Sequence, residues 1–135
     1  RNFNIDSISV GITDNPDYSR MTITTYGDKK QVDQIVKQLD KMIDTIDVKH
    51  LDEHKTLYRE LSLFKIKLSN ANDSMEINKI ANAYGGQVHN VKKTSIMIEL
   101  TATPDQTNAF EELVKPFGII DVARTGVAAL QRSEL

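Results

Sequence analysis

The chain has 135 residues, with 17 basic and 19 acidic side chains, a formal net charge of −2 and no cysteine. The lack of cysteine excludes a disulfide framework, a thiolate metal site and a cysteine nucleophile. The nearly balanced charge argues against nucleic-acid binding through a broad basic surface. No apolar run approaches the roughly 18 residues that a bilayer span requires. We therefore expect a soluble, cytoplasmic protein without membrane association, built as one ordinary domain or two small ones.

The first elements predicted along the chain are two strands. Ile8, Val10 and Ile12 alternate with small or polar residues, which is typical of a half-buried strand. Residues 14–17 (Asp-Asn-Pro-Asp) have turn chemistry. Residues 20–26 are rich in β-branched side chains and predict the second strand.

A helix follows, and its start has a capping pattern. Asp28 can cap the helix, and Gln31 three residues later completes a capping-box pair. Residues 46–50 then predict a short strand. The helix should bury one stripe of apolar side chains at 3–4 spacing: Val32, Ile35, Val36, Leu39, Met42, Ile43 and Ile46.

The second half opens with a charged stretch, residues 51–59, which lacks periodicity and predicts a linker. A strand is expected over residues 60–68, followed by a helix capped by Asn72 or Asp73. Gly85-Gly86 should end this helix, because glycine tolerates the left-handed conformation.

The remaining elements are a strand pair, a helix and a closing strand. The pair is expected over residues 87–92 and 95–101. Thr103, Pro104 and Gln106 predict a strong helix start, and Gly118 follows that helix. Residues 119–124 predict the closing strand.

The two halves repeat one order of elements. The second half predicts strand, helix, strand, strand, helix, strand, and the first half matches its last four elements. We infer an α+β fold of two ferredoxin-like βαββαβ units. The first unit would lack its opening strand and helix, roughly 20 to 25 residues by typical element lengths. We expect domains at residues 1–52 and 60–135, joined by a linker at 53–59.

The incomplete first unit has a predicted physical cost. The opening strand is central in this topology, and without it the strands at 20–26 and 46–50 each leave an unpaired edge. We expect the first unit to be frayed or completed by a partner chain. The second unit should carry most of the fold.

Catalytic and metal motifs are weak. His50, Glu53 and His54 form the letters H-x-x-E-H of one zinc peptidase class, but they straddle a strand end and a polar linker. Solvated linker histidines explain them better. His89 has no nucleophile beside it in the sequence, and no G-x-S-x-G elbow, P-loop or dinucleotide fingerprint occurs. We expect neither a catalytic residue nor a metal site.

Two functions common on ferredoxin-like folds also find little support. RNA-binding versions stack bases on strand aromatics, whereas residues 95–101 carry Ile96, Met97 and Ile98. An acylphosphatase-type hydrolase needs an arginine-lined phosphate loop after its first strand. Residues 69–72 (Ser-Asn-Ala-Asn) offer none in the second unit, and the first unit leaves that case open.

The order of letters nevertheless resembles a known family over residues 1–130. Residues 4–10 (Asn-Ile-Asp-Ser-Ile-Ser-Val) and 19–23 (Ser-Arg-Met-Thr-Ile) are similar to the small regulatory subunit of acetolactate synthase, also called acetohydroxyacid synthase. Residues 59–61 (Arg-Glu-Leu) and 121–127 (Asp-Val-Ala-Arg-Thr-Gly-Val) carry the resemblance into the second unit.

This resemblance implies an ACT domain followed by a second ferredoxin-like domain, in a protein that is not itself an enzyme. Such subunits bind and activate the catalytic (large) subunit, and they make it sensitive to valine or another branched-chain amino acid. Thiamine diphosphate, magnesium and FAD are expected on the catalytic subunit and no cofactor on this chain. At least a homodimer is expected, because the family's effector sits at an ACT dimer interface.

The resemblance also implies effector-binding residues. One wall of the family's site is a glycine-containing loop that this sequence does not include, and the other is the start of the following strand, which Asn4 and Ile5 match. The Asn4 amide offers a donor and an acceptor to an amino acid, and the Ile5 side chain offers apolar contact. Alternatively, Asn4 only begins a strand, and Arg124 and Gly126 only mark a solvated strand end and a turn.

Two other classes of function remain. The chain could be an ACT-type amino-acid sensor of a different enzyme or of a transcription regulator, which would recover no thiamine-diphosphate enzyme on co-purification. A small hydrolase of acylphosphatase type would turn over substrate by itself.

Overall fold

The computed structural model describes residues 4–42 and 44–133 and divides the chain into two compact units. Unit 1 comprises Arg1–Tyr58 and Val127–Leu135, and unit 2 comprises Arg59–Gly126. Strand residues after Gly126 group with the first unit in this division, and the domain boundaries expected from the sequence, 1–52 and 60–135, stay a prediction. Among the residues that the structure describes, no helix has the length and apolar character needed to span a lipid bilayer.

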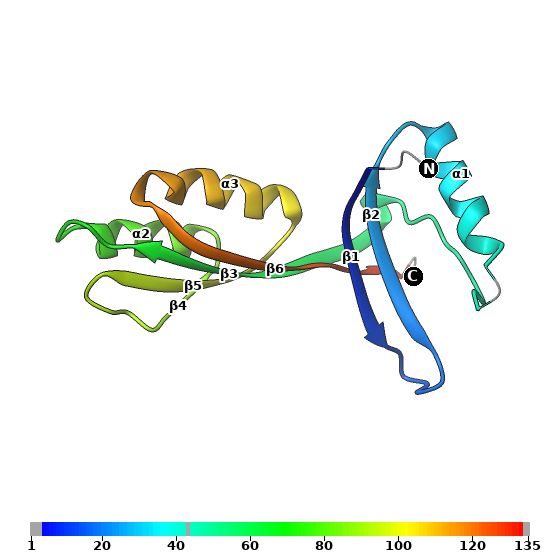
Figure 1. Ribbon diagram of the computed structural model, residues 1–135, viewed down its shortest axis with the longest axis horizontal. Coiled ribbons are helices and arrows are strands. Elements are labelled where there is room, and N and C mark those ends of the chain that lie inside the picture. The colour runs from blue at the N-terminus through cyan, green and yellow to red at the C-terminus, as the bar shows by residue number, and fades with distance from the viewer. Residues whose placement is uncertain (1–3, 43, 134–135) are drawn as a thin grey trace. The chain divides into compact units, whose positions relative to one another are not determined.

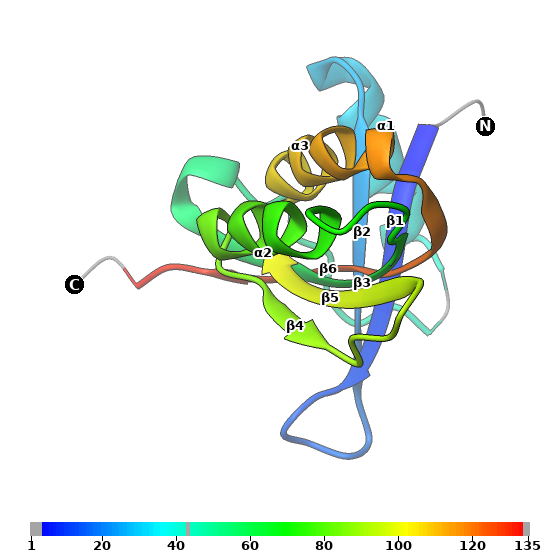
Figure 2. The ribbon, with the colours of Figure 1, turned by 90° about the vertical axis from the view of Figure 1, so that its left-hand side faces the viewer.

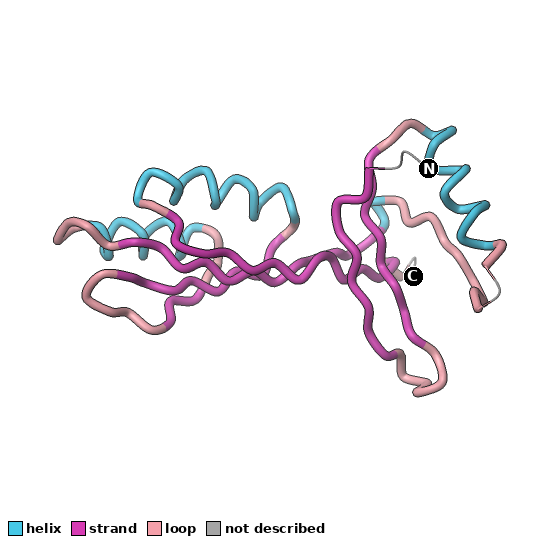
Figure 3. Tube along the Cα trace, in the orientation of Figure 1, coloured by secondary structure: helices cyan, strands magenta, loops and turns pink. Residues whose placement is uncertain are grey.

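Strands and helices both occur in each half of the chain (Figures 1 and 3). In order, they are β1 Asn4–Ile12, β2 Ser19–Tyr26, α1 Lys29–Asp40, the 3₁₀ turn η1 Glu53–Lys55, β3 Thr56–Lys67, α2 Asp73–Ala83, β4 Gln87–His89, β5 Ser95–Ala102, α3 Pro104–Val114, the 3₁₀ turn η2 Lys115–Phe117 and β6 Ile119–Gln131.

Unit 1 begins with an antiparallel hairpin of β1 and β2. The turn between them forms as predicted: the Asn15 carboxamide oxygen accepts the Asp17 N–H at 3.1 Å, and the Asn15 carbonyl accepts the Tyr18 N–H at 3.0 Å. These bonds join residues close together in the sequence and close the loop locally.

Helix α1 starts at the predicted capping box. The Asp28 carboxylate accepts the Gln31 N–H at 2.8 Å, and the Gln31 side chain accepts the Asp28 N–H at 3.0 Å. The helix ends at Asp40, so Met42 and Ile46 of the predicted stripe lie beyond it and are exposed, and Ile43 lies outside the described residues. The four stripe residues within the helix are only half-buried.

The strand predicted at residues 46–50 is wrong, because this stretch is a loop (Figure 3). A strand exists only where its main chain pairs with a neighbour, and in a βαββαβ unit the last strand pairs with the opening one. The described residues of unit 1 supply no such strand. The apolar letters alone therefore do not make a strand there.

Unit 2 has the complete ferredoxin-like order β3-α2-β4-β5-α3-β6. Its sheet has the strand order β4-β5-β3-β6, and α2 and α3 both lie on one face of it (Figures 1 and 2). The strands β3 and β5 are antiparallel, from Glu60 opposite Ala102 to Lys67 opposite Ser95. The α+β class and the βαββαβ assignment are confirmed.

The hydrophobic core lies between the helices and the sheet of unit 2. Phe110 on α3 meets Phe64 on β3 edge-to-face, with ring centroids 5.0 Å apart, and it meets Tyr84 at 5.7 Å. The buried core residues are Phe64, Ile66, Ile77, Ala81, Ile96, Ile98, Leu100, Ala102, Phe110 and Val114.

The helix boundaries of unit 2 follow local chemistry. Thr103 and Gln106 form the predicted capping box at α3. Gly85 adopts the left-handed conformation after α2, with φ +71°. Neither Asn72 nor Asp73 caps α2 as predicted, because the Asp73 carboxylate instead accepts the N–H groups of Ser69 and Asn70 at 2.8 and 2.9 Å.

Two strands are longer than the sequence predicted. Strand β3 begins at Thr56, inside the stretch expected to be a linker, and a 3₁₀ turn precedes it. Strand β6 continues past residue 124 to Gln131. Both added segments are polar or mixed in sequence and lack a clear alternation of apolar and polar residues. Their strand conformation therefore comes from pairing with a neighbouring strand.

Candidate effector-binding site

The two residues predicted to bind an effector begin strand β1. Asn4 lies opposite Tyr26 in the hairpin, and Ile5 lies opposite Thr25. The side chain of Asn4 is outside the described part of the structure. The Ile5 side chain is 50% exposed, which leaves half of its apolar surface available.

A β-bulge follows Ile5 directly. The register advances from Ile5 opposite Thr25 to Ser7 opposite Thr24, so Asp6 is an extra residue in β1. A bulge changes the direction of neighbouring side chains and interrupts the ladder of main-chain hydrogen bonds. Asp6 is exposed, and its carboxylate lies next to the two predicted residues in sequence.

The bulge decides which face Ile5 occupies. Ile5 and Ile8 are three residues apart, so a regular strand would place them on opposite faces. With Asp6 inserted, the register puts Ile5 on the same face as Ile8 and Val10, which lie opposite Ile23 and Met21. Asp6 was not predicted as part of this region, although the three-residue spacing between Ile5 and Ile8 in the apolar pattern could have indicated a bulge.

This apolar face of the hairpin is exposed rather than buried. Ile8 is 50%, Val10 63% and Met21 59% exposed. The sequence predicted that the apolar face of this strand is buried, and the structure shows that face exposed. Exposed apolar patches of this kind are unusual for a monomer and mark places where another molecule or another chain segment binds.

The opposite, polar face of the hairpin is the covered one. The Ser7 and Thr24 hydroxyls hydrogen-bond each other. The Ser9 hydroxyl donates to the Val127 carbonyl at 2.6 Å, and the Arg20 guanidinium donates to the Ala129 carbonyl at 3.3 Å. Hydroxyls and a guanidinium thus satisfy main-chain acceptors of the chain's last strand, which leaves the apolar side of the hairpin open.

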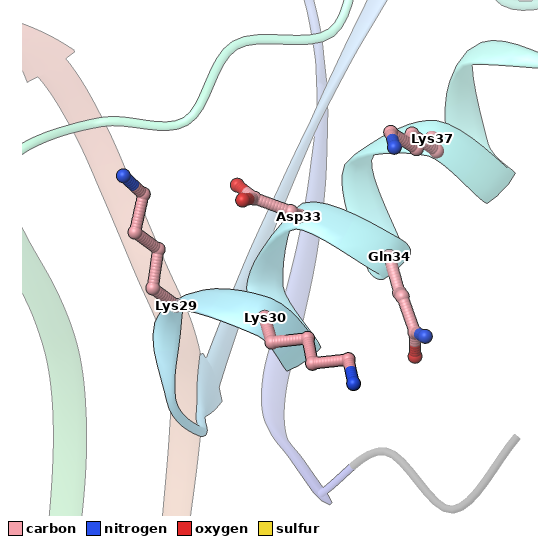
Figure 4. Close-up of a pocket in the computed structure, with 5 residues that line it drawn as sticks. All are labelled: Lys29, Lys30, Asp33, Gln34 and Lys37. Carbon is pink, nitrogen blue, oxygen red and sulfur yellow. The ribbon is translucent and has the colours of Figure 1, made fainter.

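The structure also shows a shallow depression on helix α1, apart from the predicted residues (Figure 4). Its lining side chains all come from this one helix: Lys29, Lys30, Asp33, Gln34 and Lys37. They diverge into solvent in the close-up rather than converging on a point (Figure 4). A single exposed helix face cannot enclose a ligand, so this depression is not the effector site.

The H-x-x-E-H letters do not form a metal site. Glu53–Lys55 is one 3₁₀ turn, so the two histidines do not share a helical face, and both are exposed. The Asp52 carboxylate accepts the His54 N–H at 2.9 Å. Within residues 4–42 and 44–133, no group of three or more histidine, aspartate or glutamate side chains is placed to hold a metal ion.

His89 has a partner in the structure, which the sequence did not predict. Its Nε2 lies 2.8 Å from Glu99 Oε1 on the neighbouring strand. Both side chains are partly exposed, and a pair between adjacent strands is a common means of fixing a short edge strand such as β4. We assign this pair to the sheet and not to catalysis.

The two sequence motifs of unit 2 come together in space. Glu60 on β3 is 4% exposed and receives both the Nε and an Nη hydrogen bond of Arg124 on β6. Arg124 also donates to the Asn108 carboxamide oxygen at 2.8 Å, and Glu111 lies 3.8 Å from the guanidinium. Arg124 is therefore not a solvated strand end.

The geometry explains the electrostatics of this arginine. Hydrogen bonding to Glu60 raises the pKa of the Arg124 guanidinium, partial burial opposes that rise, and the charges of Glu60 and Glu111 add to it. The guanidinium therefore stays charged, and its fork geometry matches the carboxylate. The pair clamps the first and last strands of unit 2 to each other.

The loop after β3 in unit 2 is not available to a phosphate. Its N–H groups at Ser69 and Asn70 are already bonded to the Asp73 carboxylate. An anion would have to displace a buried negative charge, since Asp73 is 6% exposed. This geometry argues against an acylphosphatase-type reaction at that loop.

Comparisons with known proteins find the same family in both halves of the chain. A family model described as the AHAS small subunit-like ACT domain matches residues 1–47, and one described as the small subunit of acetolactate synthase matches residues 59–133. The probable acetolactate synthase small subunit of Methanothermobacter thermautotrophicus is 38% identical over 132 residues, covering 98% of this chain and 79% of that protein.

Another relative and a solved structure also match. The acetolactate synthase isozyme 3 small subunit of Salmonella typhimurium is 37% identical over 135 residues, covering 99% of this chain and 82% of that protein. The crystal structure of the acetolactate synthase small subunit from Thermotoga maritima superposes with a TM-score of 0.88 at 31% identity. That match covers 99% of this chain and 83% of the other.

Proposed function

This chain belongs to the acetolactate synthase small-subunit family, and on that premise we propose that it activates a catalytic subunit and makes it sensitive to a branched-chain amino acid, valine being the first candidate. The match of the family's ACT domain to residues 1–47 carries the proposal. Thiamine diphosphate, magnesium and FAD would be bound by the catalytic subunit, which together with this chain would work in the cytoplasm.

Asn4 and Ile5 are proposed as the part of this chain that binds the effector. An amino acid presents an ammonium and a carboxylate, and the Asn4 amide offers an acceptor and a donor to them. The half-exposed Ile5 side chain and the apolar face it shares with Ile8 and Val10 suit a branched aliphatic tail. The bulge at Asp6 supports the assignment, since bulges occur preferentially beside functional sites.

The other wall of the site would be the family's glycine-containing loop from a partner protomer, a segment that this sequence does not include. The amino acid would then bridge two protomers, and it would change activity by binding one arrangement of the assembly more tightly than the other. We propose that the bound effector favours an ACT dimer geometry that withdraws the activating contacts. Equal affinity of valine for the free chain and for the activated complex would contradict this mechanism.

The test is acetolactate formation by a cognate catalytic subunit titrated with this chain, with valine, leucine or isoleucine added in turn. Activation by the chain would support the partner, and a concentration-dependent loss of activity with one of the three would identify the effector. No activation, with a longer family member active in the same assay, would count against activation by this chain. No activation by either protein would favour the amino-acid sensor of another enzyme or regulator.

The site residues can be tested in the same assay. We expect Asn4→Ala to raise the half-inhibitory effector concentration by about tenfold, since one hydrogen bond to a charged group contributes roughly 1.5 kcal/mol. Activation without effector should not change. Asn82→Ala, which removes an exposed amide from α2, is the matched control. An unchanged half-inhibitory concentration in Asn4→Ala would remove Asn4 from the site.

A further inference from the structure

The chain passes between its two compact units twice, on neighbouring strands. One passage lies between Tyr58 and Arg59 on β3, and the other lies between Gly126 and Val127 on β6. Strands β3 and β6 are adjacent in the sheet order. The covalent connection between the units is therefore two strands and nothing else of the described chain.

The backbone is irregular at the second passage. Gly126 has φ +84° although it lies within strand β6. Strand residues ordinarily have φ between about −120° and −140°, and only glycine adopts the left-handed region without a steric cost. A left-handed glycine within a strand marks a bulge or a bend.

The hydrogen bonds around Gly126 are irregular as well. In a regular ladder a main-chain N–H donates to a carbonyl of the next strand. Here the Leu61 N–H donates to the Thr125 hydroxyl at 3.1 Å, and that hydroxyl donates to the Gly126 carbonyl at 2.8 Å. A side chain thus takes the place of a main-chain acceptor in the residue just before the passage.

The segments on either side of this irregularity are anchored. On the unit 2 side, Arg124 is bound to Glu60 on β3 and to Asn108 on α3. On the unit 1 side, the Val127 carbonyl accepts the Ser9 hydroxyl at 2.6 Å, and the Arg132 N–H donates to the Lys55 carbonyl at 2.7 Å. A change of backbone angle therefore costs least between these anchors.

We infer that Thr125 and Gly126 form a hinge, about which the two units change their mutual orientation while each keeps its own structure. Hinges are a few residues at the end of an element that absorb changes of φ and ψ. Glycine supplies the conformational freedom, and the Thr125 hydroxyl replaces a rigid ladder bond. The inference goes beyond the proposed function, because it concerns the chain alone and needs neither effector nor catalytic subunit.

A distance measurement between the units tests the hinge. The sequence has no cysteine, so Lys37→Cys on α1 and Lys79→Cys on α2 introduce two unique labelling positions, both exposed. Spin labels at these positions report the distribution of distances between the units by double electron–electron resonance. We expect a broad distribution in the parent chain.

Two variants decide whether Gly126 causes the broad distribution of distances. In Gly126→Ala the left-handed conformation is strained, so the strand should move to negative φ, and the distance distribution should narrow and shift its mean. Gly85→Ala is the matched control, since it has φ +71° and an added Cβ there meets nothing within 4 Å. Its distance distribution should equal that of the parent.

Thr125→Val keeps the shape of the side chain and removes its hydroxyl, and it serves if Gly126→Ala fails to fold. It should also change the distribution, because both hydroxyl bonds disappear. A narrow parent distribution, or distributions unchanged in both Gly126→Ala and Thr125→Val, would overturn the hinge. An equal change in Gly85→Ala would overturn it too. All of these outcomes are independent of activation and of feedback inhibition.

Discussion

The two units of this chain differ in how they dispose of apolar side chains. In the part of the chain that the structure describes, every buried hydrophobic residue except Val127 belongs to unit 2. Unit 1 has a half-buried helix stripe and a hairpin whose apolar face is open. Unit 2 therefore has the internal packing that stabilises a domain, whereas unit 1 presents apolar surface that a partner or a ligand could cover.

The difference also appears in the polar contacts. Unit 2 joins its first and last strands through the buried Glu60–Arg124 pair. Unit 1 holds its hairpin through hydroxyls and a guanidinium that reach main-chain carbonyls.

The largest effect is expected in the core of unit 2. Phe110→Ala should lower the free energy of unfolding of unit 2 by about 3 to 5 kcal/mol, because it removes a fully buried ring and leaves a cavity beside Phe64 and Tyr84. Denaturant unfolding, monitored by hydrogen exchange, measures the free energy of unfolding of each unit separately. Ile35→Ala on half-buried α1 is the comparison, and an equal loss in both variants would contradict the contrast between the units.

The ion pair of unit 2 should rank second. Arg124→Met leaves the buried Glu60 carboxylate without its guanidinium and should cost about 3 kcal/mol. The double variant Glu60→Met with Arg124→Met should recover most of that loss, because no buried charge remains unpaired. Denaturant midpoints of the two variants measure this, and a double variant as unstable as the single one would mean that the pair itself supplies the stability.

The two capping boxes give a matched comparison of intermediate size. Thr103→Ala should lower the stability of unit 2 by about 1 kcal/mol, because an N–H at the start of α3 loses its acceptor. Asp28→Ala removes the same kind of bond from α1, and we expect it to raise hydrogen exchange in α1 without changing exchange in α3. Equal loss of protection in α3 for both variants would show that the units unfold together.

The smallest effect is expected on the open face of the hairpin. In the monomeric chain, Val10→Lys should change the free energy of unfolding by less than about 0.5 kcal/mol, because the side chain is 63% exposed and loses little packing. Thermal unfolding of the isolated chain measures this change. A larger loss of stability would mean that another chain covers this face in solution. The thermal unfolding of the parent chain would then depend on protein concentration.

The local structure of this protein was largely predictable from the sequence. The turn at 14–17, the capping boxes at Asp28 and Thr103, the left-handed Gly85 and the strand-helix order of unit 2 all depend on residues close together along the chain. Local hydrogen bonds and allowed φ/ψ regions are properties of a few neighbouring residues, so the letters alone indicate them.

The site was predictable only in part. Asn4 and Ile5 were identified by resemblance, and the structure places both at the start of β1, whereas the bulge at Asp6 was missed. The pairing of Glu60 with Arg124 could not be predicted from the two motifs, because 64 residues separate them. Neither motif by itself indicates which residue of the other motif it contacts.

The sequence by itself determined where most helices and turns form and that the second unit is a complete βαββαβ fold. Only the tertiary structure decided that residues 46–50 form no strand, that β6 continues to Gln131, and that the polar face of the hairpin is the covered one. The reason is physical. A strand and its buried face exist through pairing with distant main chain, so they depend on which partners are present and not on the strand's own letters.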